Sequence, residues 1–434
     1  MKTTIKSVHA RRIWDSRGRP TVEAEITLAS GVCGRGIAPA GASRGTHEAT
    51  DMRDGGSFLG GFDVQKAIAN VNEVIAKALV GQDATDQEKI DRLMLALDPS
   101  PNKAKLGGNA MIAVSLAVLH AASNAAYVPL WHYLARGKQV HLPLPQIQIF
   151  GGGAHANSRV DVQDFLVMPI GAESFARGIE MAAQVYMAAG SIMEARNKRA
   201  GVADEGGWWP NFDTNEEALE TLMQSIEHAG LRPGIDIGIA LDLAASEFYQ
   251  DGNYVLGLER KQLTSAEWEG VLVQWLHKYP IISLEDAFAE EDFTGMASLT
   301  GKFGKQVQLI GDDALVTNTQ RIKDYADRNY GNAVLVKPNQ VGTVTETIEA
   351  MEAAKALGWA TVISARSGET EDTTITHLAT GWDAKQLKVG SIARSERLAK
   401  WNEAIRIEDD ARNNVGYSGA AALNCDWRQA PWQG

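Results

Sequence analysis

The sequence of 434 residues has little cysteine and no long hydrophobic run. Its two cysteines, Cys33 and Cys425, lie near opposite ends of the chain, which excludes a disulfide framework or a cysteine-rich metal site. The most apolar segment, residues 110–126, is interrupted by polar side chains and is shorter than the roughly 20 residues that a membrane span requires. The basic amino-terminal residues precede no apolar stretch, so they are not a signal peptide. We therefore predict a cytoplasmic protein without a membrane span.

The sequence also has fewer basic than acidic residues. The 42 lysines and arginines are outnumbered by 54 aspartates and glutamates, which gives a net charge of −12. Nucleic acids and anionic membranes attract basic surfaces, so neither is an expected partner. An anionic substrate would need cations placed locally, by side chains or by a bound metal ion. The hydrophobic share of 44% and the charged share of 22% are typical of globular proteins, and the length suits two or three domains.

The first third of the chain has the pattern of an α+β domain. Residues 21–28 alternate with a period of two, which predicts a half-exposed strand in an antiparallel meander. Apolar residues then recur at helical spacing over residues 64–79 and again over residues 90–97, the second stretch after a cap near Asp86. Strands followed by helices predict an α+β domain over residues 1–135.

From about residue 140 the chain repeats an apolar run, a polar tip and an amphipathic helix. The six clearest runs are residues 237–241, 281–284, 307–310, 333–336, 361–364 and 386–389. Such short, nearly continuous apolar runs are typical of parallel strands covered on both faces. The charged residues at or near their ends are, in order, Asp242, Glu285, Asp312, Lys337, Arg366 and Lys388. We predict an α/β fold with a (β/α)₈ barrel over residues 140–434, in which these six side chains meet at one mouth.

Three of these strand ends carry acids. Asp242, Glu285 and Asp312 would repel one another unless a cation lay between them, and Mg²⁺ prefers such hard oxygen ligands while keeping positions for water or substrate oxygens. Lys337, on the next strand, would be close enough for the metal charge to lower its pKa and make it a general base. The residues therefore predict a magnesium site with a lysine base.

A metal ion beside a lysine base favours abstraction of a proton next to a carboxylate, because the dianion that forms must be neutralised. Arg366 and Ser367 would hold a second anionic group such as phosphate, with Lys388 on the carboxylate side. Residues 204–211 place two acids before a glycine pair, and an acid held there could protonate a leaving hydroxyl on the side opposite the lysine. The alternative is that the two glycines only form a turn.

Over nearly the whole chain the sequence resembles the enolase family. The segments that carry the resemblance are residues 15–18, 20–22, 41–43, 45, 47–48, 155, 163–165, 204–207, 241–242, 246–248, 285–286, 311–313, 337, 339–340, 366–372 and 394–400. This resemblance implies a metal-dependent dehydration of 2-phosphoglycerate to phosphoenolpyruvate, a barrel of enolase type and the use of two Mg²⁺ ions per active site. It also implies a homodimer or a higher homo-oligomer, formed partly through the amino-terminal domain.

The resemblance also implies a role for individual positions. Lys337 would remove the C2 proton and Glu205 would assist departure of the C3 hydroxyl. Ser43, on a mobile loop, would be a ligand of the second metal ion. His155 would lie on the phosphate side with Arg366 and Ser367. Asp164, a further catalytic candidate, stands where the family has glutamate.

Several positions depart from the family pattern. Ala365 replaces a histidine before the arginine, Ala40 removes a hydroxyl, and Arg44 adds a cation that we count among the substrate-binding residues. Trp208 and Trp209 replace a smaller pair, Pro338 follows the base, and Ala287 stands where proline is typical. Two hypotheses remain open. One is a working enolase, and the other is an enolase-like paralogue acting on a related phosphono- or phospho-carboxylate, such as a carboxyphosphonoenolpyruvate synthase.

Two interpretations from other classes are weaker. Residues 41–45 match the Gly-x-Ser-x-Gly elbow of hydrolases, but their flanks have the pattern of a loop and not of a strand and a helix. A binding protein that keeps only the barrel is disfavoured because Lys337 and Glu205 are both present.

Overall fold

An antiparallel sheet opens the chain in the computed structural model, which describes residues 2–41, 45–411 and 415–432. Strands β1 (Ile5–Trp14), β2 (Pro20–Leu28) and β3 (Cys33–Ile37) pair in that order. Burial alternates along most of β2, which confirms the predicted half-exposed meander. Helix α4 (Gly108–Ala125) packs on this sheet, and it approaches β3 closely because a Cβ at Gly34 or Gly36 would collide with the α4 backbone.

The predicted helices of the first third are confirmed. One helical segment runs through α1 (Gln65–Ala69), η2 (Asn70–Ile75) and α2 (Ala76–Leu79), and it buries its apolar positions against the sheet side. Helix α3 (Gln87–Leu97) begins after Asp86, whose side chain accepts the N–H of Lys89 and satisfies one of the free amides of the first turn. The short helices η1 (Phe58–Gly61) and α5 (Leu130–Ala135) complete this part.

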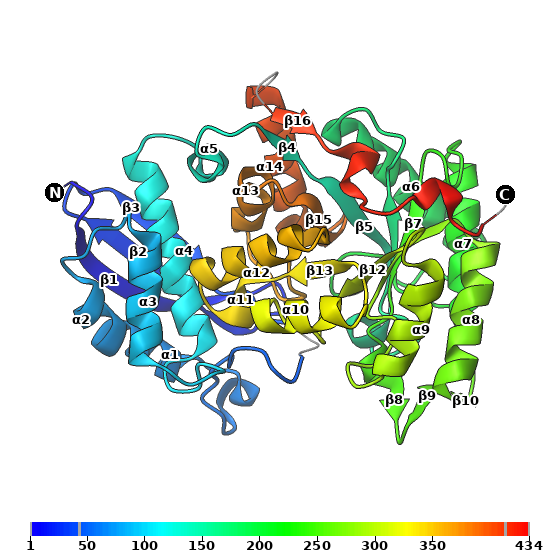
Figure 1. Ribbon diagram of the computed structural model, residues 1–434, viewed down its shortest axis with the longest axis horizontal. Helices are drawn as coiled ribbons and strands as arrows, with labels where there is room; N and C mark the ends of the chain where they lie inside the picture. Colours follow the sequence, from blue (N-terminus) through cyan, green and yellow to red (C-terminus); the bar gives the residue numbers. More distant parts are fainter. Residues whose placement is uncertain (1, 42–44, 412–414, 433–434) are drawn as a thin grey trace.

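Eight strands close into a barrel in the order β11-β12-β13-β14-β15-β5-β6-β7 (Figure 1). Their bounds are β5 (Leu144–Gly151), β6 (Asp164–Met168), β7 (Gly238–Asp242), β11 (Ile281–Glu285), β12 (Gln308–Gly311), β13 (Ala333–Val336), β14 (Ala360–Ser364) and β15 (Lys385–Ser391). The six apolar runs found in the sequence are all barrel strands. The fold class predicted from the sequence is therefore confirmed.

One strand differs from the predicted parallel arrangement. Strand β6 pairs antiparallel with both β5 and β7. The connection from β5 to β6 contains only the one-turn helix η3 (Gly153–Ala156), and a connection without a crossover helix returns the chain in the opposite direction. The sequence patterns identified neither β5 nor β6.

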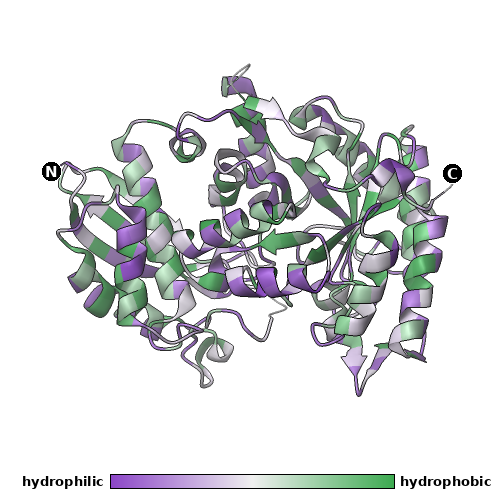
Figure 2. Cartoon of the chain, in the orientation of Figure 1, coloured by the Kyte–Doolittle hydropathy of each residue, from purple (hydrophilic) through white to green (hydrophobic). Residues whose placement is uncertain are grey.

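Helices surround the barrel and separate its strands from solvent. They are α6 (Phe175–Ala195), α7 (Asn215–His228), α8 (Ser265–Lys278), α9 (Phe293–Phe303), α10 (Thr319–Asp327), α11 (Pro338–Val341), α12 (Val344–Ala356), α13 (Thr374–Gly381) and α14 (Ser395–Ala411). In Figure 2 the barrel strands are mainly hydrophobic, whereas the surrounding helices carry both colours. None of the helices in the described ranges combines the length and the hydropathy of a membrane span.

Smaller elements decorate this core. Strands β8 (Tyr249–Gln250), β9 (Asn253–Leu256) and β10 (Lys261–Leu263) form a separate antiparallel sheet after η4 (Ala245–Phe248), and β4 (Val140–Leu142) pairs parallel with β16 (Val415–Tyr417). The chain described beyond β16 contains η6 (Gly419–Ala422) and η7 (Trp427–Gln429).

The segment after β3 connects the first third of the chain to the barrel mouth. Ala40 forms an isolated antiparallel bridge with Gly368, just beyond β14. The side chain of Asn339, beyond β13, donates to the carbonyl oxygen of Pro39. Residues distant in sequence thus meet over the carboxyl ends of the strands, where an active site is expected in a barrel.

Candidate active site

The six charged side chains predicted at strand ends do converge. Asp242 and Glu285 are the last residues of β7 and β11, and Asp312 and Lys337 directly follow β12 and β13. Strand register places Glu285 opposite Asp242. Arg366 lies two residues beyond β14, and Lys388 lies within β15. The complete set is buried, as side chains pointing into a barrel mouth would be.

Two ammonium groups lie among the three predicted metal-binding acids. Lys388 Nζ is 2.7 Å from Asp242 Oδ2 and 2.9 Å from each carboxylate oxygen of Glu285. Lys337 Nζ donates to Asp312 Oδ2. The three carboxylates therefore surround positively charged groups. Hard oxygen donors grouped in this way are suitable ligands for a divalent cation such as Mg²⁺.

A second layer of acids supports this cluster. Asp286 accepts the backbone N–H groups of Asp312 at 2.8 Å and Asp313 at 3.0 Å, which fixes the backbone that carries the metal-side carboxylate. Asp286, Asp312 and Asp313 each offer an oxygen to one small cluster. The sequence signal was the doubled acids at residues 285–286 and 312–313, but only the fold shows that the second acid of each pair lies behind the first.

The charges in this cluster shift one another's pKa values. Burial, together with the neighbouring charge of Asp242, raises the pKa of Glu285 well above its usual range. For Lys337, burial would lower the pKa, but the negative charges of Asp312, Asp313 and Glu285 together outweigh it and the pKa is raised. This direction differs from the lowering expected from the sequence, because the lowering depends on metal charge and the acids alone have the opposite effect.

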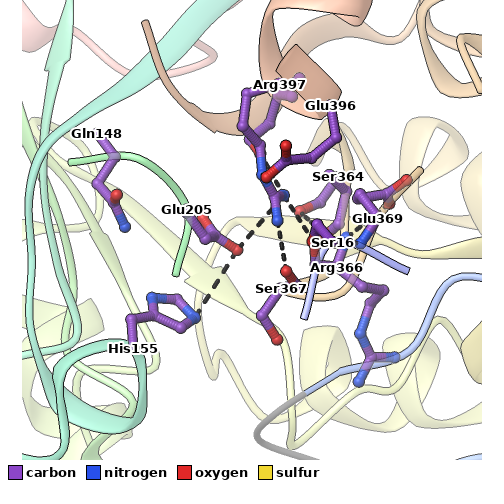
Figure 3. Close-up of polar contacts among 12 residues, drawn as sticks. Ser16, Gln148, His155, Glu205, Ser364, Arg366, Ser367, Glu369, Glu396 and Arg397 are labelled. Atoms are coloured by element: carbon purple, nitrogen blue, oxygen red, sulfur yellow. Dashed lines mark hydrogen bonds and ion pairs between the residues drawn. The ribbon is translucent and has the colours of Figure 1, made fainter. Parts of the chain in front are cut away.

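Glu205 lies on another side of the site, in the loop before Gly206 and Gly207. Its Oε1 is 3.7 Å from His155 Nε2 and 3.8 Å from Arg397 Nη1, and Figure 3 shows the three side chains in line. His155 Nδ1 lies 2.9 Å from Asp164 Oδ1. Burial would lower the pKa of His155, but Asp164 and then Glu205 outweigh it and raise the pKa to about 9.

Both sides open onto one cavity. Its lining includes the predicted base and acid, the phosphate-side and carboxylate-side candidates, and two departures from the family pattern, Asp164 and Ala365. The residues named so far that line it are Lys337, Glu205, His155, Asp164, Asp242, Arg366, Ser367, Lys388 and Ala365. A small anion in this cavity would contact the cations Arg366 and Lys388, the predicted base Lys337 and the predicted acid Glu205.

The strand tip at Arg366 and Ser367 is held from both sides. Glu48 pairs with the two terminal nitrogens of Arg366 at 3.0 and 3.2 Å, a two-point contact that fixes the plane of the guanidinium. Arg397 is fully buried and donates to the carbonyl oxygens of Arg366, Ser367 and Val389. Sequence reasoning missed the contacts of Glu48 and Arg397, although both lie in segments that resemble the enolase family.

The predictions for Ser43 and Arg44 fall in residues 42–44, which lie outside the described residues. The neighbouring Gly45 is close to the acid cluster, because a Cβ there would be 2.5 Å from the carbonyl oxygen of Asp313. Strand β3 ends at Ile37 and the next helix begins at Phe58. The described flanks of residues 42–44 are therefore a loop and not the strand and helix that a hydrolase elbow needs.

The sequence of this chain is similar to known proteins over both the first third and the barrel. Residues 5–134 match the family model described as the enolase N-terminal domain, and residues 139–425 match that of the enolase C-terminal TIM barrel domain. The chain is also 51% identical over 416 residues to the protein named Enolase 1 from Desulfitobacterium hafniense (strain Y51), which covers 95% of each chain. The chain belongs to the enolase family.

The departures from the enolase pattern have different structural consequences. Ala365 lines the cavity, whereas Ala287 is buried and its carbonyl oxygen accepts the indole N–H of Trp268. Trp208 stacks on Tyr186 with ring centroids 4.7 Å apart and donates to the carbonyl oxygen of that residue. Trp208 therefore packs on α6, whereas Ala365, like Asp164, borders the enolase-type site.

Proposed function

We propose that this enolase-family chain dehydrates 2-phosphoglycerate to phosphoenolpyruvate, the hydro-lyase reaction of glycolysis. The observation that carries the proposal is the single cavity lined by both Lys337 and Glu205. Elimination of water needs a base at one carbon and an acid at the hydroxyl of the next, and both groups must reach one small substrate.

The three carboxylates of Asp242, Glu285 and Asp312 are the proposed magnesium ligands, and Ser43 is proposed as a ligand of a second ion. Their fit to a cation rests on oxygen donors that already share ammonium groups in the structure. When bound, Mg²⁺ supplies positive charge that neutralises the acids and stabilises the enolate dianion.

Lys337 is the proposed base. In its neutral form Nζ takes the proton from C2, while Arg366, Ser367 and His155 hold the phosphate and Lys388 holds the carboxylate. Arg44 is a further candidate for substrate binding. The Glu48 contact keeps the guanidinium plane of Arg366 fixed. The Arg366 side chain would therefore lose little conformational freedom when it binds the phosphate.

Glu205 is the proposed acid that gives a proton to the C3 hydroxyl as it leaves. His155 and Asp164 stand behind it, with the imidazole between the two carboxyl groups. A protonated His155 at neutral pH, as its raised pKa indicates, stabilises the negative charge that Glu205 acquires after giving up its proton.

The test is the gain in absorbance when purified protein receives 2-phosphoglycerate and Mg²⁺. We expect turnover that depends on both, and a kcat about 10⁴-fold lower in the Lys337→Met variant, the upper range for loss of a general base. A wild-type rate equal to the rate without protein, for folded and metal-loaded protein, would exclude the proposal.

A second candidate substrate is a related phosphono- or phospho-carboxylate. The observation that favours it is Ala365 in the cavity lining, next to Arg366, because a short side chain there leaves space for a different anionic group. Competition between 2-phosphoglycerate and a phosphono analogue decides between the two. Preference for the analogue in the wild type, reversed in Ala365→His, would support this second candidate.

The remaining proposals concern organisation. Residues 1–135 would cover the site and carry Ser43, and residues 140–434 would hold the catalytic and metal-binding residues. The family membership supports a homodimer or higher homo-oligomer in the cytoplasm, which light scattering after size exclusion and cell fractionation would test.

A further inference from the structure

Gln148, a buried residue of β5, uses both of its polar side-chain atoms beneath the acid side of the site. Its Nε2 donates to Asp164 Oδ1, and its Oε1 accepts the backbone N–H of Gly207 at 2.8 Å. Gly207 lies two residues after Glu205 in the same loop. One amide group therefore contacts both the acid behind His155 and the loop that carries Glu205.

The space around this amide is shaped by two glycines. A Cβ at Gly207 would lie 2.5 Å from Gln148 Oε1, and a Cβ at Gly151 would lie 3.1 Å from Gln148 Nε2. Any side chain at Gly207 would push the amide away from its partners, since real Cβ atoms do not approach an oxygen so closely. The glycines thus leave a slot that the glutamine side chain fills.

The lengths of Gln148 and Asp164 are matched. Strand register fixes the backbone of Asp164 opposite Gly151 and opposite Asp242, so the reach of residue 164 depends on its side chain alone. Asp164 is one methylene shorter than the glutamate of the family pattern. Shortening Gln148 to asparagine would withdraw the amide by about 1.5 Å, one carbon–carbon bond, which is enough to break both hydrogen bonds.

We propose that Gln148 is a positioning residue whose length compensates for the short Asp164 and thereby aligns His155 with Glu205. The amide holds the Asp164 carboxylate, and the carboxylate holds His155 Nδ1. The other ring nitrogen faces Glu205, as Figure 3 shows. The same amide holds the Glu205 loop through Gly207. The inference rests on the proposed function, in which Glu205 protonates the leaving hydroxyl.

Exchanging the methylene between the two residues tests this coupling. The four proteins are the wild type, Gln148→Asn, Asp164→Glu and the double variant, which has the same number of side-chain carbon atoms as the wild type. We expect each single change to lower kcat for 2-phosphoglycerate about 10²-fold, the effect of misplacing a group by about 1 Å. We expect the double variant to recover to within about tenfold of the wild type, whereas independent effects would multiply to about 10⁴-fold.

A second readout separates positioning from loss of folding. Exchange of the C2 proton with solvent depends on Lys337, which Gln148 does not contact, so the single variants should keep exchange while they lose dehydration. The matched control is Gln146→Asn, the same change two residues earlier on β5, where the amide donates to Gln386 at 3.0 Å and touches neither Asp164 nor Gly207. We expect its kcat to stay within about threefold of the wild type.

Several outcomes would overturn the inference: single variants with wild-type kcat, a double variant as slow as the product of the singles, or equal loss of exchange and dehydration. Failure of the proposed function would look different, because the wild type itself would not turn over. In that event the nitrogen NMR signal of His155 Nδ1 decides the matter. It should move in each single variant and return in the double variant, and an unchanged signal in the singles would contradict the coupling.

Discussion

The two sides of the site are built differently. On the metal side, Asp242, Glu285 and Asp312 stand at the ends of consecutive strands, each supplied by one strand and helix unit. On the acid side, Glu205 and His155 come from connections, and Asp164 comes from β6, the antiparallel strand of the barrel. The metal side places its groups by the regular geometry of the barrel, whereas the acid side depends on side-chain contacts such as those of Gln148. Substitutions on the two sides should therefore impair different steps of the reaction.

The largest expected effect is removal of divalent cations. Chelation should lower turnover of 2-phosphoglycerate to the uncatalysed rate, and Mg²⁺ should restore it, because the enolate dianion then has its neutralising charge. The absorbance assay on dialysed protein measures this. The control is the same chelator treated with excess Mg²⁺ before addition. Full turnover by protein holding less than about one ion per ten chains would show that the three acids are not a metal site.

Next in size is Lys337→Met, which removes the base and leaves a side chain of similar length. We expect kcat to fall by about 10⁴-fold, the upper range for a general base, and C2 proton exchange to be lost with it. Lys323→Met, on the exposed face of α10, is the matched control and should keep both activities. If exchange persisted in Lys337→Met, the base would be another group.

Glu205→Gln should have a smaller effect of another kind. The amide keeps the shape but has no acidic proton, so we expect kcat to fall about 10²- to 10³-fold while C2 exchange continues. Comparing exchange with dehydration in this variant and in Lys337→Met directly contrasts the two sides. Glu194→Gln, an exposed residue at the end of α6, serves as the control. Parallel loss of exchange and dehydration would place Glu205 at the first step instead.

The smallest effect concerns stability and pH. The folded-state pKa of His155, raised to about 9 from 6.5, means that folded protein keeps a proton which the unfolded chain releases. Its contribution to the free energy of unfolding is full below about pH 6.5 and is lost as the pH rises towards 9, by about 1 kcal/mol per pH unit. Urea unfolding in metal-free buffer should show this decline in the wild type and a shallower one in His155→Gln. Equal slopes would contradict a charged His155.

Much of the fold could be predicted because its signals are local. The six apolar runs and the acids or bases that follow them lie within a few residues of one another, and parallel strands bring their ends to one mouth. The signal for β5 was weaker, since the polar residues Gln146 and Gln148 interrupt its apolar run. Strand β6 begins at Asp164 and continues with four apolar residues, a run that the sequence reasoning missed. The antiparallel direction of β6 depends on a connection between residues 151 and 164 that holds the single turn η3 and no crossover helix, which strand patterns do not show.

The site could be predicted only in part. Lys337 beside Asp312 followed from neighbouring strands, but the Glu48 contact with Arg366 joins residues 318 positions apart. Arg397 belongs to a helix that contributes no strand-end charge, and its contacts are with backbone carbonyl oxygens. Neither spacing nor composition specifies such contacts.

By itself, the sequence determined which residues are available for chemistry and where along the chain each strand ends, because apolar periodicity and charge are properties of neighbouring residues. Only the tertiary structure decided that β6 reverses and that one glutamine amide joins Asp164 to the Glu205 loop. The physical reason is that a hydrogen bond between distant residues requires atomic positions within a few tenths of an ångström, and the closed barrel with all its packed helices sets those positions.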